Sequence, residues 1–210
     1  MRSLYVVTHP ESVHHVTDLV GGWFDSELTD RGFCQAELIA ERIRELVPDD
    51  AAVELYSSDL TRADQTARVI ARKLGVEPIV VEGLREKSYG EAEGKAQTWL
   101  DERFLPPPPT GDRMNHHEGI AGAETKHDFA ARIYDVVSAI LSSSCSHHVI
   151  VTHGGALTFV LAAWIDLPLE AAGYISVLSS SGGITVLEQD DFFHNRAVVS
   201  LNDTWHLTHG

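Results

Sequence analysis

The sequence has little cysteine, few positive charges and no long apolar run. Two cysteines, Cys34 and Cys145, in 210 residues are too few for a disulfide framework and lack the spacing of zinc ligands, so we expect a reducing compartment. Lys and Arg number 16 against 31 Asp and Glu, a formal net charge of -15. This balance argues against nucleic acid or an anionic membrane as a partner, because there is no diffuse positive field. An anionic ligand would need a local cluster of arginines.

No segment has the pattern of a signal peptide or of a membrane span. The chain does not open on a basic stretch followed by an apolar one. The most apolar window, residues 148–167, is interrupted by His153, two glycines and Asp166, which favours a strand and a buried helix over a span. We therefore expect a cytoplasmic protein with a small-molecule partner, and leave its oligomeric state open. With 43% hydrophobic residues, residues 1–210 can form a single domain with a full core.

Strands alternate with helices along most of the chain. Helical patterns cover about 29–46, 61–74, 124–141 and the stretch after Gly154, and strands are predicted at 3–7, 53–56, 78–81, 148–151, 174–178, 183–188 and 197–201. This alternation predicts a mostly parallel central sheet with helices on both faces, a three-layer α/β sandwich. The alternation stops between about 87 and 122, where Pro106 to Pro109 exclude a helix or a central strand. We expect a cap or lid insertion there, and a plain linker is the alternative.

Two of the predicted strands end in histidine. His9 follows the first strand, and Pro10 prevents that strand from continuing at the centre of a sheet. His153 follows the strand at 148–151 and precedes two glycines and a helical stretch. In open α/β sheets, ligands bind at the carboxyl ends of the strands. The pattern therefore predicts two imidazoles at a ligand-binding edge.

Several motifs accompany these histidines in a fixed order. They are Thr8-His9-Pro10-Glu11-Ser12, Asp25, Ser57 to Ala67, Leu84-Arg85-Glu86, Tyr89-Gly90, and Val151-Thr152-His153-Gly154-Gly155. Together they resemble the histidine phosphatase superfamily, which contains phosphoglycerate mutases and broad-specificity phosphatases, and the resemblance covers nearly the whole chain. It implies a phosphoglycerate mutase-like fold. It also implies a metal-independent phosphomonoester hydrolase that acts through phosphohistidine and needs no cofactor.

The resemblance assigns catalytic roles to three residues. His9 would be the nucleophile, because a neutral imidazole can attack phosphorus and hold the phosphoryl group. Glu86 would protonate the leaving alkoxide, with Glu91 and Glu93 as alternatives. His153 would help to stabilise the transferred phosphoryl group. The residues expected to bind the substrate are Arg62, Thr8, Ser12, Thr152, Gly154 and Arg113.

Two residues depart from the family pattern around the nucleophile. Thr8 stands where the family has an arginine, and Pro10 stands where it has a glycine; His15 also replaces a frequent asparagine. Losing a buried arginine–phosphate contact costs about 2–5 kcal/mol if nothing replaces it. We expect Arg85, Lys87 or Arg113 to substitute. The departure keeps two alternatives open, a mutase and a catalytically impaired relative that binds phosphorylated ligands or a protein partner.

Three pairs of adjacent histidines, at 14–15, 116–117 and 147–148, invite a metal-site interpretation. Adjacent residues of a strand point to opposite faces, and no further ligand has the required spacing. We therefore predict solvated histidines and no metal site.

Overall fold

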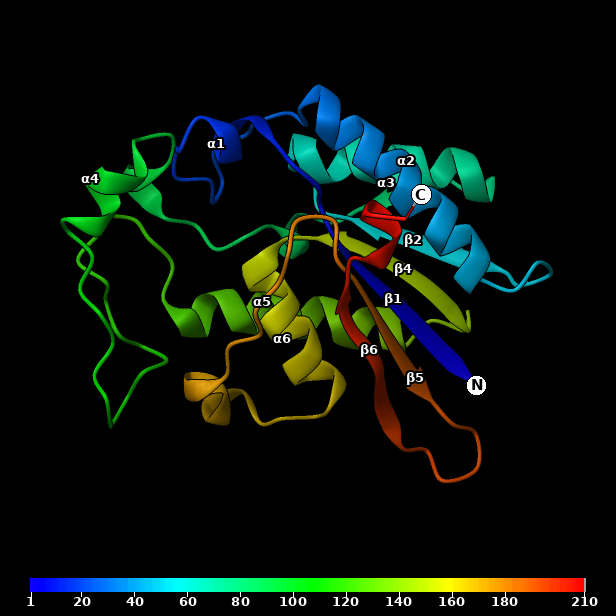
Figure 1. Ribbon diagram of the computed structural model, residues 1–210. Coiled ribbons are helices and arrows are strands. Elements are labelled where there is room, and N and C mark those ends of the chain that lie inside the picture. Colours follow the sequence, from blue (N-terminus) through cyan, green and yellow to red (C-terminus); the bar gives the residue numbers. More distant parts are fainter. Residues whose placement is uncertain (210) are drawn as a thin grey trace.

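The centre of the computed structural model, which describes residues 1–209, is a six-stranded sheet with the order β3-β2-β4-β1-β5-β6 (Figure 1). β1 pairs with β4, β4 with β2, and β2 with β3 in parallel, whereas β5 and β6 are antiparallel to their neighbours. The prediction of a mostly parallel sheet is confirmed. The strands are β1 (Arg2–Thr8), β2 (Val53–Ser57), β3 (Pro78–Val80), β4 (His147–Thr152), β5 (Ile184–Gln189) and β6 (Arg196–Asp203).

Four long helices cover the two faces of the sheet (Figure 1). They are α2 (Asp30–Leu46) and α3 (Thr61–Leu74) on one face, and α5 (Lys126–Leu141) and α6 (Gly154–Trp164) on the other. Side chains of β1 alternate between the two layers, since Leu4 and Val6 pack with α5 and α6 while Tyr5 and Val7 pack with α2 and α3. This alternation is the two-residue period of a strand. The chain therefore forms the predicted three-layer α/β sandwich.

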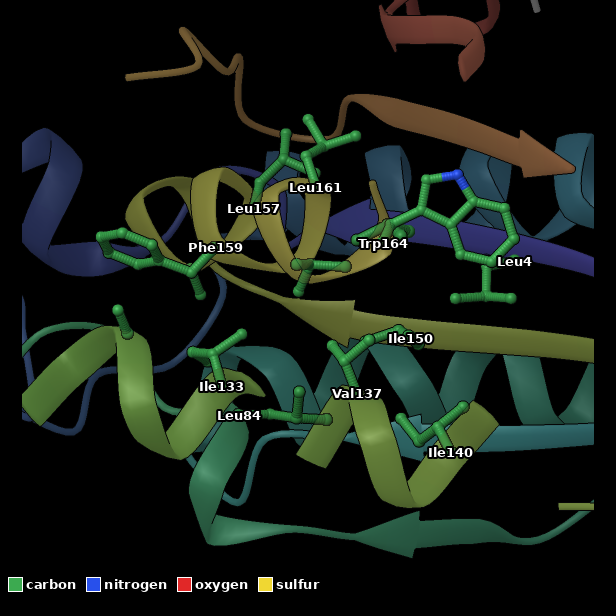
Figure 2. Close-up of a cluster of buried hydrophobic side chains, with 14 of the residues drawn as sticks. Leu4, Leu84, Ile133, Val137, Ile140, Ile150, Leu157, Phe159, Leu161 and Trp164 are labelled. Carbon is green, nitrogen blue, oxygen red and sulfur yellow. The ribbon is translucent and has the colours of Figure 1, made fainter. Parts of the chain in front are cut away.

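Helix α6 is buried on nearly all sides. Its side chains from Ala156 to Ala162 and Trp164 belong to the core, as expected for a helix that is apolar all round. Phe159 packs edge-to-face against Phe129 of α5 with ring centroids 5.1 Å apart, and Trp164 lies beside Leu4 (Figure 2). Because the helix is held by so many contacts, its first residues after His153 have a fixed position at the sheet edge.

Residues 82–125 leave the sheet and contain short elements only, in the part of the chain where we predict a cap or lid insertion at about 87–122. These are η1 (Glu82–Leu84), η2 (Gly90–Ala92) and α4 (Gln97–Asp101). Leu100 and Ile120 of the insertion form a small core with Val20, which lies in the segment before α2. The insertion lies at the same end of the molecule as α1 (Val13–Val16) (Figure 1). The insertion is therefore tied to the loop that follows His9.

Gly90 allows the insertion to fold back closely on itself. Its φ is +52°, and a Cβ atom there would lie 2.2 Å from the carbonyl oxygen of Ala121. We expect Gly90→Ala to lower the free energy of unfolding by at least about 2 kcal/mol, through left-handed strain and the backbone clash. Gly75→Ala is the matched control, since Gly75 has φ +72° with no atom near the added carbon, and it should cost about 1 kcal/mol. Urea unfolding of both variants measures the difference, and equal losses would contradict the close approach.

The prediction of a strand at 174–178 is wrong. A 3-10 helix, η3 (Leu169–Tyr174), occupies the start of this stretch, and an extended loop follows. Ile175 and Val177 pack against the core beside α6, and the backbone N–H of Val177 donates to the hydroxyl of Thr158. Ile175 and Val177 are therefore partly buried without pairing with a strand. Among residues 1–209, no helix combines the length and hydropathy of a membrane span.

Candidate active site

The two strand-end histidines meet because their strands are parallel neighbours. β1 and β4 pair in a register that places Thr8 opposite Thr152. The next residue continues this register, since the backbone N–H of His9 donates to the carbonyl of Thr152 at 3.0 Å. The rings of His9 and His153 lie edge-to-face with centroids 5.1 Å apart. Chain segments more than 140 positions apart thus form one histidine pair.

His9 is held as a neutral imidazole with a defined tautomer. Its Nδ1 lies 2.9 Å from the carbonyl oxygen of Pro10; a carbonyl only accepts hydrogen bonds, so Nδ1 carries the proton and Nε2 has the free lone pair. Burial and the nearby Arg62 guanidinium hold the pKa of His9 well below its usual value. Proline retains its carbonyl, so Pro10 can fix this tautomer. Nε2 is therefore the nitrogen of His9 with an available lone pair.

Arg62 places a guanidinium beside His9. The residue begins the first turn of α3 and is 1% exposed. Its Nε–H donates to Nε2 of His9 at 3.2 Å, and its two terminal nitrogens donate to the carbonyls of Phe24 at 2.9 Å and Gly22 at 2.7 Å. Three of its five N–H groups are used in this way. Two N–H groups therefore remain to bind an anion.

Asp25 stabilises the end of α3 that carries Arg62. Its carboxylate accepts two hydrogen bonds from Thr61, one from the backbone N–H and one from the hydroxyl, both at 2.7 Å. A carboxylate at this position stabilises the N-terminus of a helix. The motif residue Asp25 thus fixes the start of α3 next to His9.

Glu86 is fixed at both its carboxyl group and its backbone. Its carboxyl oxygens accept from the backbone N–H groups of Lys87 at 2.9 Å and Gly155 at 2.8 Å. Its carbonyl accepts from Trp23 Nε1 and from Arg132, each at 2.7 Å. Burial raises the pKa of Glu86, and the two hydrogen bonds to its carboxyl oppose that rise. A carboxyl with a raised pKa is suited to donate a proton near neutral pH.

His9, Arg62 and Glu86 line one cavity of about 460 Å³. Of its described lining residues, Arg62 alone carries a permanent positive charge. His153 is fully buried behind His9 and is not part of the cavity wall. The other lining residues are Thr8, His14, His15, Asp18, Leu19, Val20, Gly21, Gly22, Tyr89, Gln97, Leu100, Gly154, Ser179, Ser180 and Ser181.

The structure brings Thr8 and Gly154 to this cavity. The Thr8 hydroxyl is occupied, since it donates to the carbonyl of Ser180 at 2.7 Å and accepts from the backbone N–H of Gly183 at 3.1 Å. Thr8 therefore holds the loop that carries three serines of the cavity wall. A threonine hydroxyl engaged in this way does not replace a guanidinium.

Two other residues predicted to bind substrate lie away from the cavity. The hydroxyl of Thr152 donates to the carbonyl of Leu84 at 2.8 Å and is fully buried. Ser12 is also fully buried and precedes α1, where its hydroxyl lies 3.0 Å from Nδ1 of His14. Both side chains contact the protein and not the cavity, so the structure gives their predicted substrate contacts no geometric support.

The three basic residues predicted to replace the family's arginine also lie outside the cavity wall. Arg113 donates to backbone carbonyls in and near the insertion and lines a second cavity of about 370 Å³. Lys87 and Arg85 form ion pairs with Glu118 and Asp59. Each of these charges has a partner within the protein. None of the three therefore places a charge at the cavity wall beside His9.

His14 and His15 line the cavity. The prediction of solvated histidines is wrong for His14, which is buried, but His15 is exposed as predicted, and neither residue lies on a strand. They lie on the four-residue helix α1, so adjacent side chains can face the same space. Their ring centroids are 4.2 Å apart, and that of His15 is 5.4 Å from His9. A four-residue helix is too short to show a period in the sequence. The adjacent histidines at 14 and 15 were the sequence signal for this part of the cavity. The assumption that they lie on a strand led to the wrong interpretation.

A different part of the sheet contains a group with metal-ligand spacing. Ligand atoms of Glu54, Cys145 and His148 lie within 4.8 Å of one another, at the amino ends of β2 and β4. His148 is fully buried, so the prediction that all these histidines are solvated is wrong for it. The Glu54 carboxylate already accepts from the hydroxyls of Tyr56 at 2.7 Å and Ser143 at 3.0 Å.

Comparison with known proteins identifies the family. A sequence model described as the Histidine phosphatase superfamily (branch 1) matches residues 4–204. The chain belongs to this superfamily. The predicted resemblance is therefore confirmed over nearly the whole chain.

Relatives of this histidine phosphatase carry phosphatase and mutase names. A Hydrogenobacter thermophilus protein named "Putative phosphoserine phosphatase 2" is 30% identical, with 98% of each chain covered. A Yersinia pestis protein named "Probable phosphoglycerate mutase GpmB" is 28% identical over 99% of this chain and 95% of its own. The solved mycobacterial glucosyl-3-phosphoglycerate phosphatase superposes with a TM-score of 0.78 at 24% identity, covering 97% of this chain and 100% of its own. The similarity to this solved structure supports the assignment of the fold.

Proposed function

We propose that this histidine phosphatase hydrolyses a small phosphomonoester through a phosphohistidine at His9. The observation that carries the proposal is a neutral His9, with its Nε2 lone pair beside Arg62, on the same cavity as the half-buried carboxyl of Glu86. These are the parts that nucleophilic phosphoryl transfer requires, namely a nucleophile, a cation and an acid.

In the first step, Nε2 of His9 attacks phosphorus and the bond from phosphorus to the leaving oxygen breaks. The Nε–H of Arg62, which donates a hydrogen bond to Nε2 of His9 in the free site, then donates to a phosphoryl oxygen instead. The leaving alkoxide takes the proton of Glu86. In the second step, water attacks phosphorus, Glu86 removes the proton of that water, and the phosphorus–nitrogen bond breaks. His9 keeps its Nδ1–H bond to Pro10 throughout.

His153 supports the transferred group from behind His9. Its Nε2 lies 2.9 Å from the Ser58 hydroxyl, and its Nδ1 is buried with no partner among the described residues. A buried polar group without a partner costs about 1–3 kcal/mol. A shift of this ring toward the cavity would let a phosphoryl oxygen on His9 supply that partner, which supports a role for His153 in stabilising the phosphoenzyme.

The leaving group would extend into the second cavity, because Glu86 and Tyr89 line both cavities. An acid at this boundary can reach the bridging oxygen when the phosphoryl group is next to His9. The second cavity is lined by the cations Lys87, Arg113 and Lys126, by Glu118, which pairs with Lys87, and by three phenylalanines. We propose a leaving group with a carboxylate or hydroxyl groups, in keeping with relatives named for phosphoserine and phosphoglycerate.

Release of phosphate from p-nitrophenyl phosphate, phosphoserine and 3-phosphoglycerate tests the proposed reaction. We expect hydrolysis that survives EDTA, because the described group with metal-ligand spacing lies elsewhere in the sheet. Transfer of the phosphoryl group to a second hydroxyl in preference to water would favour the mutase alternative. Phosphate binding with no turnover would replace the proposal with a silent binding protein. A cytoplasmic location is part of the proposal and can be tested by fractionation.

A further inference from the structure

A phosphoryl group beside His9 needs more donors than Arg62 can supply. A phosphate ester carries a charge of about -1.5 to -2 near neutral pH and has three strong acceptor oxygens. Besides Arg62, the charged side chains of the described cavity wall are the acids Asp18 and Glu86. The wall also has neutral polar residues such as Gln97 and Ser179, but the rings that lie beside His9 are those of His14 and His15, with centroids 6.1 and 5.4 Å from its own.

His14 presents Nε2 at the cavity wall. Its Nδ1 lies 2.7 Å from the hydroxyl of Ser26 and 3.0 Å from that of Ser12. The Ser26 hydroxyl has no other described partner and can donate to Nδ1, which leaves the proton on Nε2. A Cβ on Gly21, which also lines the cavity, would lie 2.7 Å from Nε2. The glycine therefore makes room for this edge of the ring.

His15 has the same tautomer for a stronger reason. The backbone N–H of Ser12, which can only donate, lies 3.3 Å from Nδ1 of His15. The proton of the neutral ring is therefore on Nε2, which has no partner among the described residues. The ring is stacked on that of His9 with an interplanar angle of 15°. Both histidines of α1 thus offer a free N–H beside the nucleophile.

The surroundings disfavour the charged form of both rings. Burial, then His15 and Arg62, lower the pKa of His14 to about 3. Burial and Arg62 also lower the pKa of His15, and Glu11 opposes this change. The charged groups that face the pair are Arg62 from α3, Glu11 from the loop after β1, Asp18 from the loop after α1, and Glu86 from the segment after η1.

We infer that His14 and His15 bind the phosphoryl oxygens as neutral donors, each through its Nε2–H, in place of a second guanidinium. The inference rests on the proposed function, because it requires a phosphoryl group beside His9. It gives the site one permanent positive charge and two neutral donors. Binding of a dianion then needs no proton uptake by these rings.

Sulfate binding measured by calorimetry tests the inference without depending on turnover, because sulfate stays a dianion across the pH range in which imidazole titrates. Glutamine retains an N–H donor near the Nε2 position and does not titrate, whereas leucine has a similar size and no donor. We expect His14→Gln and His15→Gln to bind sulfate within about three-fold of wild type, and His14→Leu and His15→Leu to bind at least about ten-fold more weakly. Wild-type affinity should stay constant between about pH 7 and about pH 9.

Three results would overturn the inference. Leucine variants that bind like wild type would show that the rings are not ligands. Glutamine variants as weak as the leucine variants, or wild-type affinity that falls steadily with pH, would show that the rings act as cations. Gly21→Ala, which leaves both histidines in place but crowds Nε2 of His14, should weaken sulfate binding, whereas Val16→Gln on the exposed side of α1 should not. Wild type that binds sulfate as expected but never releases phosphate from esters would instead reject the proposed function.

Discussion

Replacing His9 with asparagine should abolish the phosphoenzyme and lower kcat by at least about 10⁴-fold, the scale seen when a covalent nucleophile is removed. The asparagine amide can keep the hydrogen bond to the Pro10 carbonyl, so the loop should retain its conformation. Asparagine has no nitrogen lone pair to replace that of Nε2, which accepts a hydrogen bond from Arg62 in the wild type. Rapid quench with ³²P-labelled substrate should give acid-labile, base-stable label on wild type and none on the variant.

The matched control for this experiment is His194→Asn. His194 is exposed, has a φ of +58° that asparagine tolerates well, and lies outside the described cavity walls near His9. It should be labelled and turn over like wild type. If the His9 variant were labelled to the same extent as wild type, the nucleophile would be another histidine, and His153 would be tested next.

The placement of His9 and His153 was predictable because each follows an apolar strand with a clear boundary. Pro10 marks the end of one strand, and the glycines after His153 mark the end of the other. Their contact required a further fact, namely that β1 and β4 are neighbours in register. Strand order depends on which helices cover which face, and the individual strand patterns do not carry that information.

The sequence could not predict which residue replaces the arginine that the family has at the position of Thr8. The sequence shows Thr8, but whether Arg113 or Lys87 points toward His9 depends on how the insertion packs. In the structure Lys87 is paired with Glu118, and Arg113 is bonded to backbone carbonyls. Short elements such as α1 are set by tertiary contacts and not by a repeating pattern. The histidines on α1 therefore become visible as site residues only in three dimensions.

Glu86→Gln should affect substrates according to how much their leaving groups need a proton. Glutamine is nearly isosteric with Glu86 but has no acidic proton to give to an alkoxide. We expect kcat/KM for phosphoserine to fall about 10²- to 10⁴-fold, and that for p-nitrophenyl phosphate by less than about ten-fold, because nitrophenolate leaves without protonation.

The pH dependence should change in the same variant. Burial raises the pKa of Glu86, so the acid form persists above the usual carboxyl range and is lost as pH rises through that pKa. Wild-type kcat/KM for phosphoserine should therefore decline on the alkaline side, and this decline should be absent in Glu86→Gln. Glu91→Gln is the control, since Glu91 is exposed and lies outside both described cavities. An equal loss on both esters in Glu86→Gln, with the alkaline decline unchanged, would assign the proton to another carboxyl, and Glu93 would then be the next to replace.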